Sequence, residues 1–109
     1  MAYYMAQISY TQDSIKAMAA TPQDRGAEAA KLLEAMGGKV HQFFFAFGDY
    51  DAVIIGELPD NVTMAACSMA VSAAGTVSAF KTTPLLTMDE AMEAMKKAGA
   101  VSGYRPPAS

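Results

Sequence analysis

The sequence predicts a single α+β domain built on a four-stranded antiparallel sheet. The chain has 109 residues, which suits one domain. Hydrophobic residues make up 52% of it, so the chain can bury a compact core. Strand-like and helix-like segments follow one another in the order strand, helix, strand, strand, helix, strand, and one further helix comes last. We predict that the domain occupies residues 1–101 and that a tail occupies residues 102–109.

The first strand and the helical segments after it are marked by composition and by capping residues. Residues 3–10 are rich in aromatic and β-branched side chains, which favour a strand. Thr11 can cap a short helix over residues 12–20, and the pair Thr21-Pro22 is a signal for the start of a second helical segment. That segment is expected to carry an apolar stripe at helical spacing, formed by Ala29, Leu32, Leu33 and Met36.

The glycine pair Gly37-Gly38 ends this helix and precedes two apolar strands, which we predict over residues 39–47 and 50–57. Between them, Gly48-Asp49 suits a two-residue II′ turn, because glycine accepts a positive φ at the first central position. A three-residue turn that includes Tyr50 also fits the sequence. The two turns pair the strands differently, so both alternatives remain open.

The second half of the chain is predicted as helix, strand and helix. Asp60 can cap the first of these helices, and residues 76–86 form a strand that Pro84 confines to a sheet edge or an irregular end. Thr87 and Glu90 have the spacing of a capping box at the start of the last helix. The expected apolar stripes are Val62, Ala65, Ala66, Met69 and Ala73 on one helix and Met88, Ala91, Met92, Met95 and Ala98 on the other.

This order of elements is that of the split βαβ, ferredoxin-like motif. Right-handed crossovers place both main helices on the same face of the sheet, and two helices can cover only that face. The strand over residues 39–47 nevertheless has large apolar residues on both sides, with Phe43 and Phe45 pointing one way and Phe44 the other. An exposed phenylalanine forgoes about 1.5–3 kcal/mol of burial.

A second copy of the chain is therefore the partner that we predict, in a homodimer or higher oligomer formed through the uncovered sheet face. The alternative is that the last helix folds back over this face of its own chain.

The hairpin tetrapeptide Gly48-Asp49-Tyr50-Asp51 lies between an aromatic strand and an aliphatic strand, and Leu58-Pro59-Asp60 follows before an alanine-rich helix. This arrangement, over residues 1–98, resembles the GYD domain family. The resemblance implies a ferredoxin-like fold that assembles as a dimeric α/β barrel, in which two sheets face each other. It implies no particular chemistry, because the wider group includes cofactor-free monooxygenases, lactone isomerases, haem-binding enzymes and effector-sensing modules.

Two kinds of function fit these observations best, and a third, an effector-sensing module, is disfavoured as a function of this domain alone because no DNA-binding segment is apparent. The first is a binding or scaffolding domain that acts through its sheet face. The second is a small cofactor-independent enzyme, monooxygenase-like or isomerase-like, that acts on an apolar small molecule in a cavity between helices and sheet. The candidate ligand-binding residues are His41, Tyr10, Tyr50 and Asp51, and His41 or Asp51 could act as a general base.

Each of these side chains also has a structural interpretation. His41 can lie at the solvent end of its strand, Tyr50 can pack across strands, and Asp51 can accept backbone hydrogen bonds.

Composition argues against several other classes of function. The net charge is −3 and no basic cluster occurs, which argues against nucleic-acid binding. Cys67 is the single cysteine, so the chain has no internal disulfide, and with one histidine it cannot form a familiar zinc site. We predict no cofactor and no metal. The chain shows no signal-peptide pattern and no apolar run long enough to span a bilayer, so we expect a cytoplasmic protein without a membrane partner.

Overall fold

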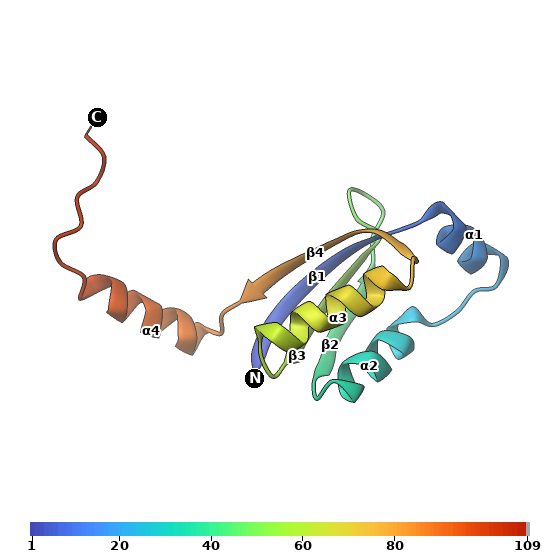
Figure 1. The fold of residues 1–109 in the computed structure, drawn as a ribbon, viewed down its shortest axis with the longest axis horizontal. Helices are drawn as coiled ribbons and strands as arrows, with labels where there is room; N and C mark the ends of the chain where they lie inside the picture. The colour runs from blue at the N-terminus through green and yellow to red at the C-terminus, as the bar shows by residue number, and fades with distance from the viewer. Residues whose placement is uncertain (109) are drawn as a thin grey trace.

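The computed structural model of the protein describes residues 1–108, which form one antiparallel sheet with helices on one of its faces (Figure 1). The elements are β1 (Ala2–Tyr10), α1 (Gln12–Ala20), α2 (Arg25–Ala35), β2 (Lys39–Phe45), β3 (Ala52–Leu58), α3 (Asn61–Ala73), β4 (Val77–Leu85) and α4 (Met88–Gly99). The strand order is β2-β3-β1-β4. The predicted α+β, ferredoxin-like fold is confirmed, and so is the edge position of the proline-containing strand, β4.

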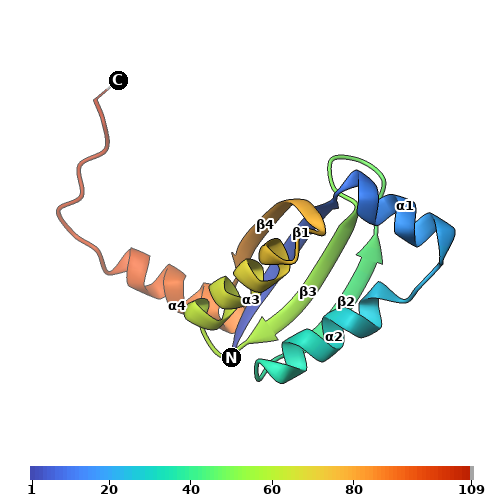
Figure 2. The same cartoon turned by 45° about the vertical axis from the view of Figure 1, so that its right-hand side comes forward.

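Alternation along the central strand β1 defines the two faces of the sheet. Tyr4, Ala6 and Ile8 are buried under α2 and α3, and Figure 2 shows both helices on this side. Met5 and Gln7 point to the other side, which we call the open face. Residues that pair directly across strands lie on the same face of the sheet, so the pairing identifies the other open-face residues. Met5 pairs with Ile55, and Gln7 pairs with Val53 and Lys81. On the next strand, Phe44 pairs with Val53.

The core joins α2 and α3 to the sheet. One buried cluster combines Leu33 of α2 with Met64 and Cys67 of α3 and with Tyr4 and Leu58 of the sheet. A second cluster lies under the middle of the sheet and consists of Ala6, Ile8, Ala52 and Ile54. Both clusters lie on the helix side, so the open face contributes nothing to the core.

The helix caps agree with the sequence except at α2. Thr11, Asp60 and Thr87 cap α1, α3 and α4, and Thr87 with Glu90 forms the predicted capping box. The predicted start of α2 at Thr21-Pro22 is wrong. The N-cap is Asp24, whose Oδ1 accepts a hydrogen bond from the Ala27 N–H at 3.0 Å. Asp24 provides an acceptor that satisfies a first-turn amide, and a helix begins where such an acceptor lies.

At its C-terminal end α2 stops as predicted. Gly37 adopts φ +84° and donates to the carbonyl of Glu34, and Gly38 donates to the carbonyl of Leu33 at 2.8 Å. These are the two hydrogen bonds of a Schellman motif.

The connection between β2 and β3 is longer than either turn that the sequence suggested. It comprises residues 46–51, and Phe47, predicted to lie in a strand, has a fully exposed side chain in it. The Asp51 N–H donates to the carbonyl of Ile8 at 2.8 Å, and the Asp51 carboxylate accepts from the Tyr10 N–H at 2.9 Å. Asp51 is thus bonded to the end of β1, and its carbonyl also accepts from the Ala46 N–H at 2.7 Å. The hairpin therefore closes around residues 47–50, and both tight-turn predictions are wrong.

The buried face of α3 also differs from the prediction. Met64 and Cys67 face the sheet, whereas Val62 and Met69 of the predicted stripe are largely exposed. The helix is apolar on nearly every side, so periodicity alone does not select the face that packs.

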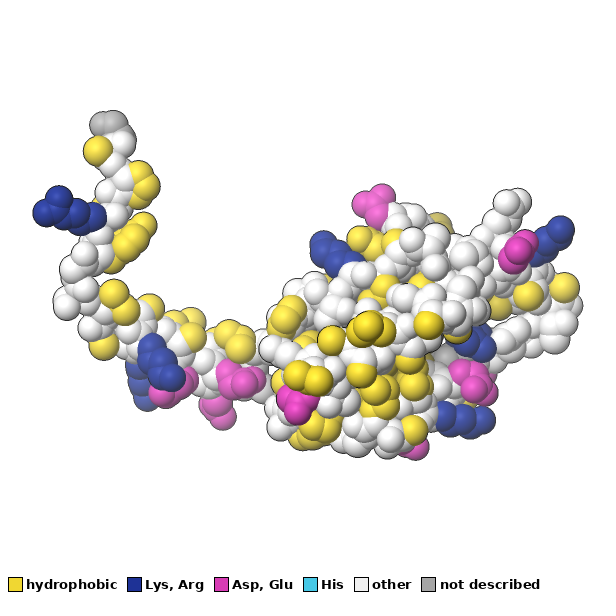
Figure 3. Space-filling view, in the orientation of Figure 1, with side chains coloured by type: hydrophobic (Ala, Val, Ile, Leu, Met, Phe, Trp, Pro, Cys, Tyr) yellow, Lys and Arg dark blue, Asp and Glu magenta, His cyan; other side chains and the backbone are white. Residues whose placement is uncertain are grey.

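The last helix does not cover the open face. In Figure 1, α4 extends away from the sheet and residues 100–108 continue beyond it without helix or strand. Apolar side chains gather along one side of α4 and charged side chains along the other (Figure 3). The alternative that α4 shields the open face of its own chain is therefore wrong.

Gly56 of β3 is expected to be essential for the packing of α2. A Cβ at this position would lie 2.8 Å from Cδ2 of Leu33 and 2.9 Å from the carbonyl oxygen of Lys39. We expect Gly56→Ala to lower the free energy of unfolding by about 1–3 kcal/mol, because the substitution overpacks the core. Urea denaturation followed by circular dichroism measures this loss. The control is Gly48→Ala, whose Cβ would meet nothing within 4 Å, and equal losses in both variants would contradict the assignment.

Candidate functional site

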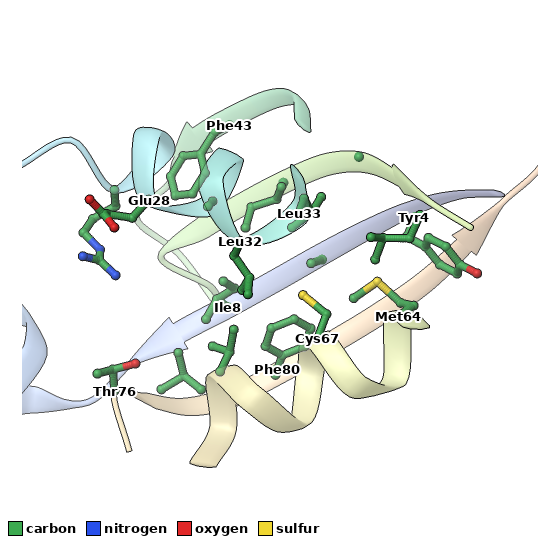
Figure 4. A pocket seen from close by; sticks show the side chains of 18 of the residues that line it. Tyr4, Ile8, Glu28, Leu32, Leu33, Phe43, Met64, Cys67, Thr76 and Phe80 are labelled. Atoms are coloured by element: carbon green, nitrogen blue, oxygen red, sulfur yellow. The ribbon is translucent and has the colours of Figure 1, made fainter. Parts of the chain in front are cut away.

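A cavity of about 240 Å³ lies between the sheet and the two helices that cover it (Figure 4). It exists because α2 packs mainly against β2 and α3 mainly against β4, so the central strands are only partly covered between them. The walls are mostly apolar. Ile8 of β1, Leu32 of α2, Cys67 of α3 and Phe80 of β4 all point into it.

The two ends of the cavity differ in polarity. Glu28 and Thr76 lie at one end and Tyr4 and Met64 at the other (Figure 4). At the second end, the Tyr4 hydroxyl is already engaged, since it donates to Oδ1 of Asn61 at 2.6 Å. The first end also includes Tyr10 and Arg25. A ligand in this cavity would therefore meet apolar walls along its length and several polar side chains at one end.

Tyr10 is held at the polar end by its neighbours. Its N–H donates to the Asp51 carboxylate at 2.9 Å, and its ring lies 5.9 Å from that of Phe45. Burial raises the pKa of the Tyr10 phenol; the nearby Arg25 guanidinium opposes this shift and the Asp51 charge adds to it. The phenol is consequently neutral at physiological pH, where its O–H can donate a hydrogen bond.

Of the four predicted ligand-binding residues, Tyr10 lines this cavity, whereas His41, Tyr50 and Asp51 do not. Asp51 holds the end of β1 from the loop, and Tyr50 lies beside it in the same connection. His41 lies on the open face, with Nε2 3.4 Å from Oε1 of Glu57 and its ring stacked on Tyr3 at 5.3 Å. The structure thus brings Tyr10 and Asp51 together and places His41 elsewhere.

The described residues include one thiol, that of Cys67, and several side chains of the types that bind metals, and neither kind forms a reactive centre within them. Cys67 is buried in the cavity wall, and burial raises the pKa of its thiol, which keeps it protonated and poorly nucleophilic. Within residues 1–108, no group of three or more His, Cys, Asp or Glu side chains is arranged to hold a metal ion. None of the helices in the same range has the length and apolarity that crossing a bilayer requires.

Arg25 is the site residue that the sequence analysis missed. It is half-buried at the start of α2 and lines the polar end of the cavity. A signal for it was present, because Arg25 precedes Ala29 by one helical turn and so continues the predicted stripe backwards. The predicted stripe consists of apolar residues alone, so it does not include the charged Arg25.

The comparison with protein families identifies the chain. The model of the family described as GYD domain matches residues 4–95, which is most of the chain, so the chain belongs to the GYD domain family. No curated protein matches it.

Asp51 is expected to act as a structural anchor for Tyr10. Asp51→Ala leaves the partly buried Tyr10 N–H without its acceptor, so we expect the free energy of unfolding to fall by about 1–3 kcal/mol. Asp51→Asn retains a carbonyl oxygen and should lose less. Chemical denaturation measures both, with Asp49→Ala as a control on an exposed loop side chain. Equal losses for Asp51→Ala and Asp49→Ala would rule out the anchoring role.

Proposed function

We propose that this GYD domain is a self-associating module that binds a small apolar molecule in the cavity between its sheet and α2 and α3. The observation that carries the proposal is the cavity itself, about 240 Å³ in volume, with apolar walls and polar groups at one end. Small-molecule sites have this composition, in which the apolar walls supply affinity and a few polar groups fix orientation. An unfilled apolar cavity also lowers stability, because the atoms of its walls lack packing partners.

The open face supports self-association. Met5, Phe44, Val53 and Ile55 form a continuous apolar centre on it, and the Phe44 side chain is 58% exposed. No element within residues 1–108 covers this centre. A second copy placed against it about a two-fold axis would bury the same residues of both chains. This is the arrangement of sheets that the family resemblance implies.

The exposed helix α4 fits the same assembly. Its apolar side carries Met88, Met92 and Met95, each more than half exposed, while the polar side carries lysines and acidic residues. An isolated helix of this length is marginally stable in water, so packing against another surface must supply most of its stability. We therefore assign α4 as an arm that packs on the second copy, with methionines that adapt to the surface they meet.

The alternative of an enzyme with a general base in the cavity has no supporting contact. The Asp51 carboxylate accepts the Tyr10 N–H and does not line the cavity, and His41 lies across the sheet from it. Catalysis by His41 or Asp51 stays a hypothesis, and the binding function accounts for the geometry without it.

Self-association is tested by placing a charge on the open face. We expect Phe44→Arg to reduce the mass measured by size-exclusion chromatography with light scattering to that of the 11.5 kDa monomer, because the arginines would lie in an apolar interface. Phe44 is exposed in the monomer, so the fold should tolerate this change. The control is Met69→Arg on the outer side of α3, which should leave the mass unchanged. A native chain that is monomeric at micromolar concentration would refute the assembly.

Ligand binding is tested with 1-octanol as a neutral apolar probe. We expect the native chain to bind it in calorimetry and Ala29→Phe, which fills the cavity from α2, to weaken binding by about tenfold or more. The matched control is Ala27→Phe, on the exposed side of the same helix, which should bind as the native chain does. If the native chain fails to bind 1-octanol and octanoate alike, the proposed function is wrong.

A further inference from the structure

The cavity has a positive charge at its polar end. The Arg25 guanidinium is half-buried there, and within residues 1–108 no carboxylate oxygen lies within 4 Å of it. Its hydrogen bonds go to neutral acceptors, Oε1 of Gln23 at 3.1 Å and the Tyr10 hydroxyl. A guanidinium has five N–H donors in one plane, so most of them remain available for a ligand.

Tyr10 adds a second donor beside this charge. Its side chain lines the same end of the cavity, and the Arg25 charge is close enough to influence its ionisation. The Asp51 bond to its N–H and the packing against Phe45 fix the position of Tyr10. Two donors on different elements, one from β1 and one from α2, therefore converge on one end of an otherwise apolar space.

The acidic groups nearby are occupied by other partners. Glu28 lies at the same end, but its Oε1 is 3.4 Å from Nζ of Lys31, and its side chain is about half exposed, so solvent weakens its charge. Asp51 accepts the Tyr10 N–H from outside the cavity lining. Neither carboxylate forms an ion pair with Arg25.

We infer that the ligand of this cavity is an apolar carboxylate, whose anionic end is bound by Arg25 and Tyr10 and whose hydrocarbon part lies between α2 and α3. The inference rests on the proposed function of the cavity and names the chemical class of its ligand. A planar carboxylate matches the fork of an arginine, which can donate two parallel hydrogen bonds to it. The Ile8, Leu32 and Phe80 side chains supply the apolar walls.

A smaller cavity of about 140 Å³ adjoins this polar end. Tyr10, Arg25 and Thr76 line both cavities, and Ser14 and Met18 of α1 line the second one. Arg25 and Tyr10 therefore lie between the larger, mostly apolar cavity and the smaller cavity, whose lining combines polar and apolar side chains. A carboxylate bound by Arg25 would close the larger cavity from the smaller one.

The test compares octanoate with 1-octanol, which have the same alkyl chain and differ in their end group. By calorimetry at neutral pH, we expect the native chain to bind octanoate about tenfold more tightly than 1-octanol. Arg25→Gln should abolish this preference, because octanoate loses far more affinity than 1-octanol does. Tyr10→Phe should weaken octanoate binding more than 1-octanol binding. The control is Lys97→Gln on α4, which removes a positive charge far from the cavity and should keep the preference.

A variant that binds octanoate more tightly cannot be explained by unfolding, which would only weaken binding. Glu28→Gln removes the remaining negative charge from the polar end, so octanoate should gain affinity relative to the neutral 1-octanol. If the native chain binds both ligands equally, or if Arg25→Gln retains the preference for octanoate, the inference is overturned and the proposed binding function stands. If the native chain binds neither ligand, both are overturned.

Discussion

The structure depends on how two helices cover a four-stranded sheet. The α2 helix packs against β2 at one edge and α3 against β4 at the other, so the central strands are left partly uncovered between them. Gly56 allows Leu33 to approach the sheet closely at one end, where the core closes over Tyr4 and Leu58. The cavity runs from this end along β1 to Tyr10, between the two helices and the sheet.

The contact between Asp51 and the end of β1 connects the fold to the site. Asp51, the last residue of the β2–β3 connection, accepts a hydrogen bond from the Tyr10 N–H, and its own N–H donates to the carbonyl of Ile8. These bonds join the start of β3 to the end of β1 and fix Tyr10 beside Arg25. Asp51, which the sequence suggested as a general base, thus holds Tyr10 in position from outside the cavity lining.

The two faces of the sheet have different roles. The helix side provides the core and encloses a space of ligand size, whereas the open face and α4 leave apolar surface without a partner in the same chain. An assembly through the open face would not occlude the cavity, because the sheet lies between them. Binding and self-association can therefore be tested independently, with substitutions on opposite sides of β1 and β3.

The sequence by itself determined the fold class, the order of elements, most helix caps, the edge position of β4 and the family, because these follow from local signals such as Asp60, Thr87 and Gly37. It identified Tyr10 but could not place it. Only the tertiary structure decided the loop after Phe45 and the buried face of α3, because a long-range contact set the first and an all-round apolar helix left the second undefined. The same holds for Arg25, whose role exists only where β1 and α2 meet around a shared cavity.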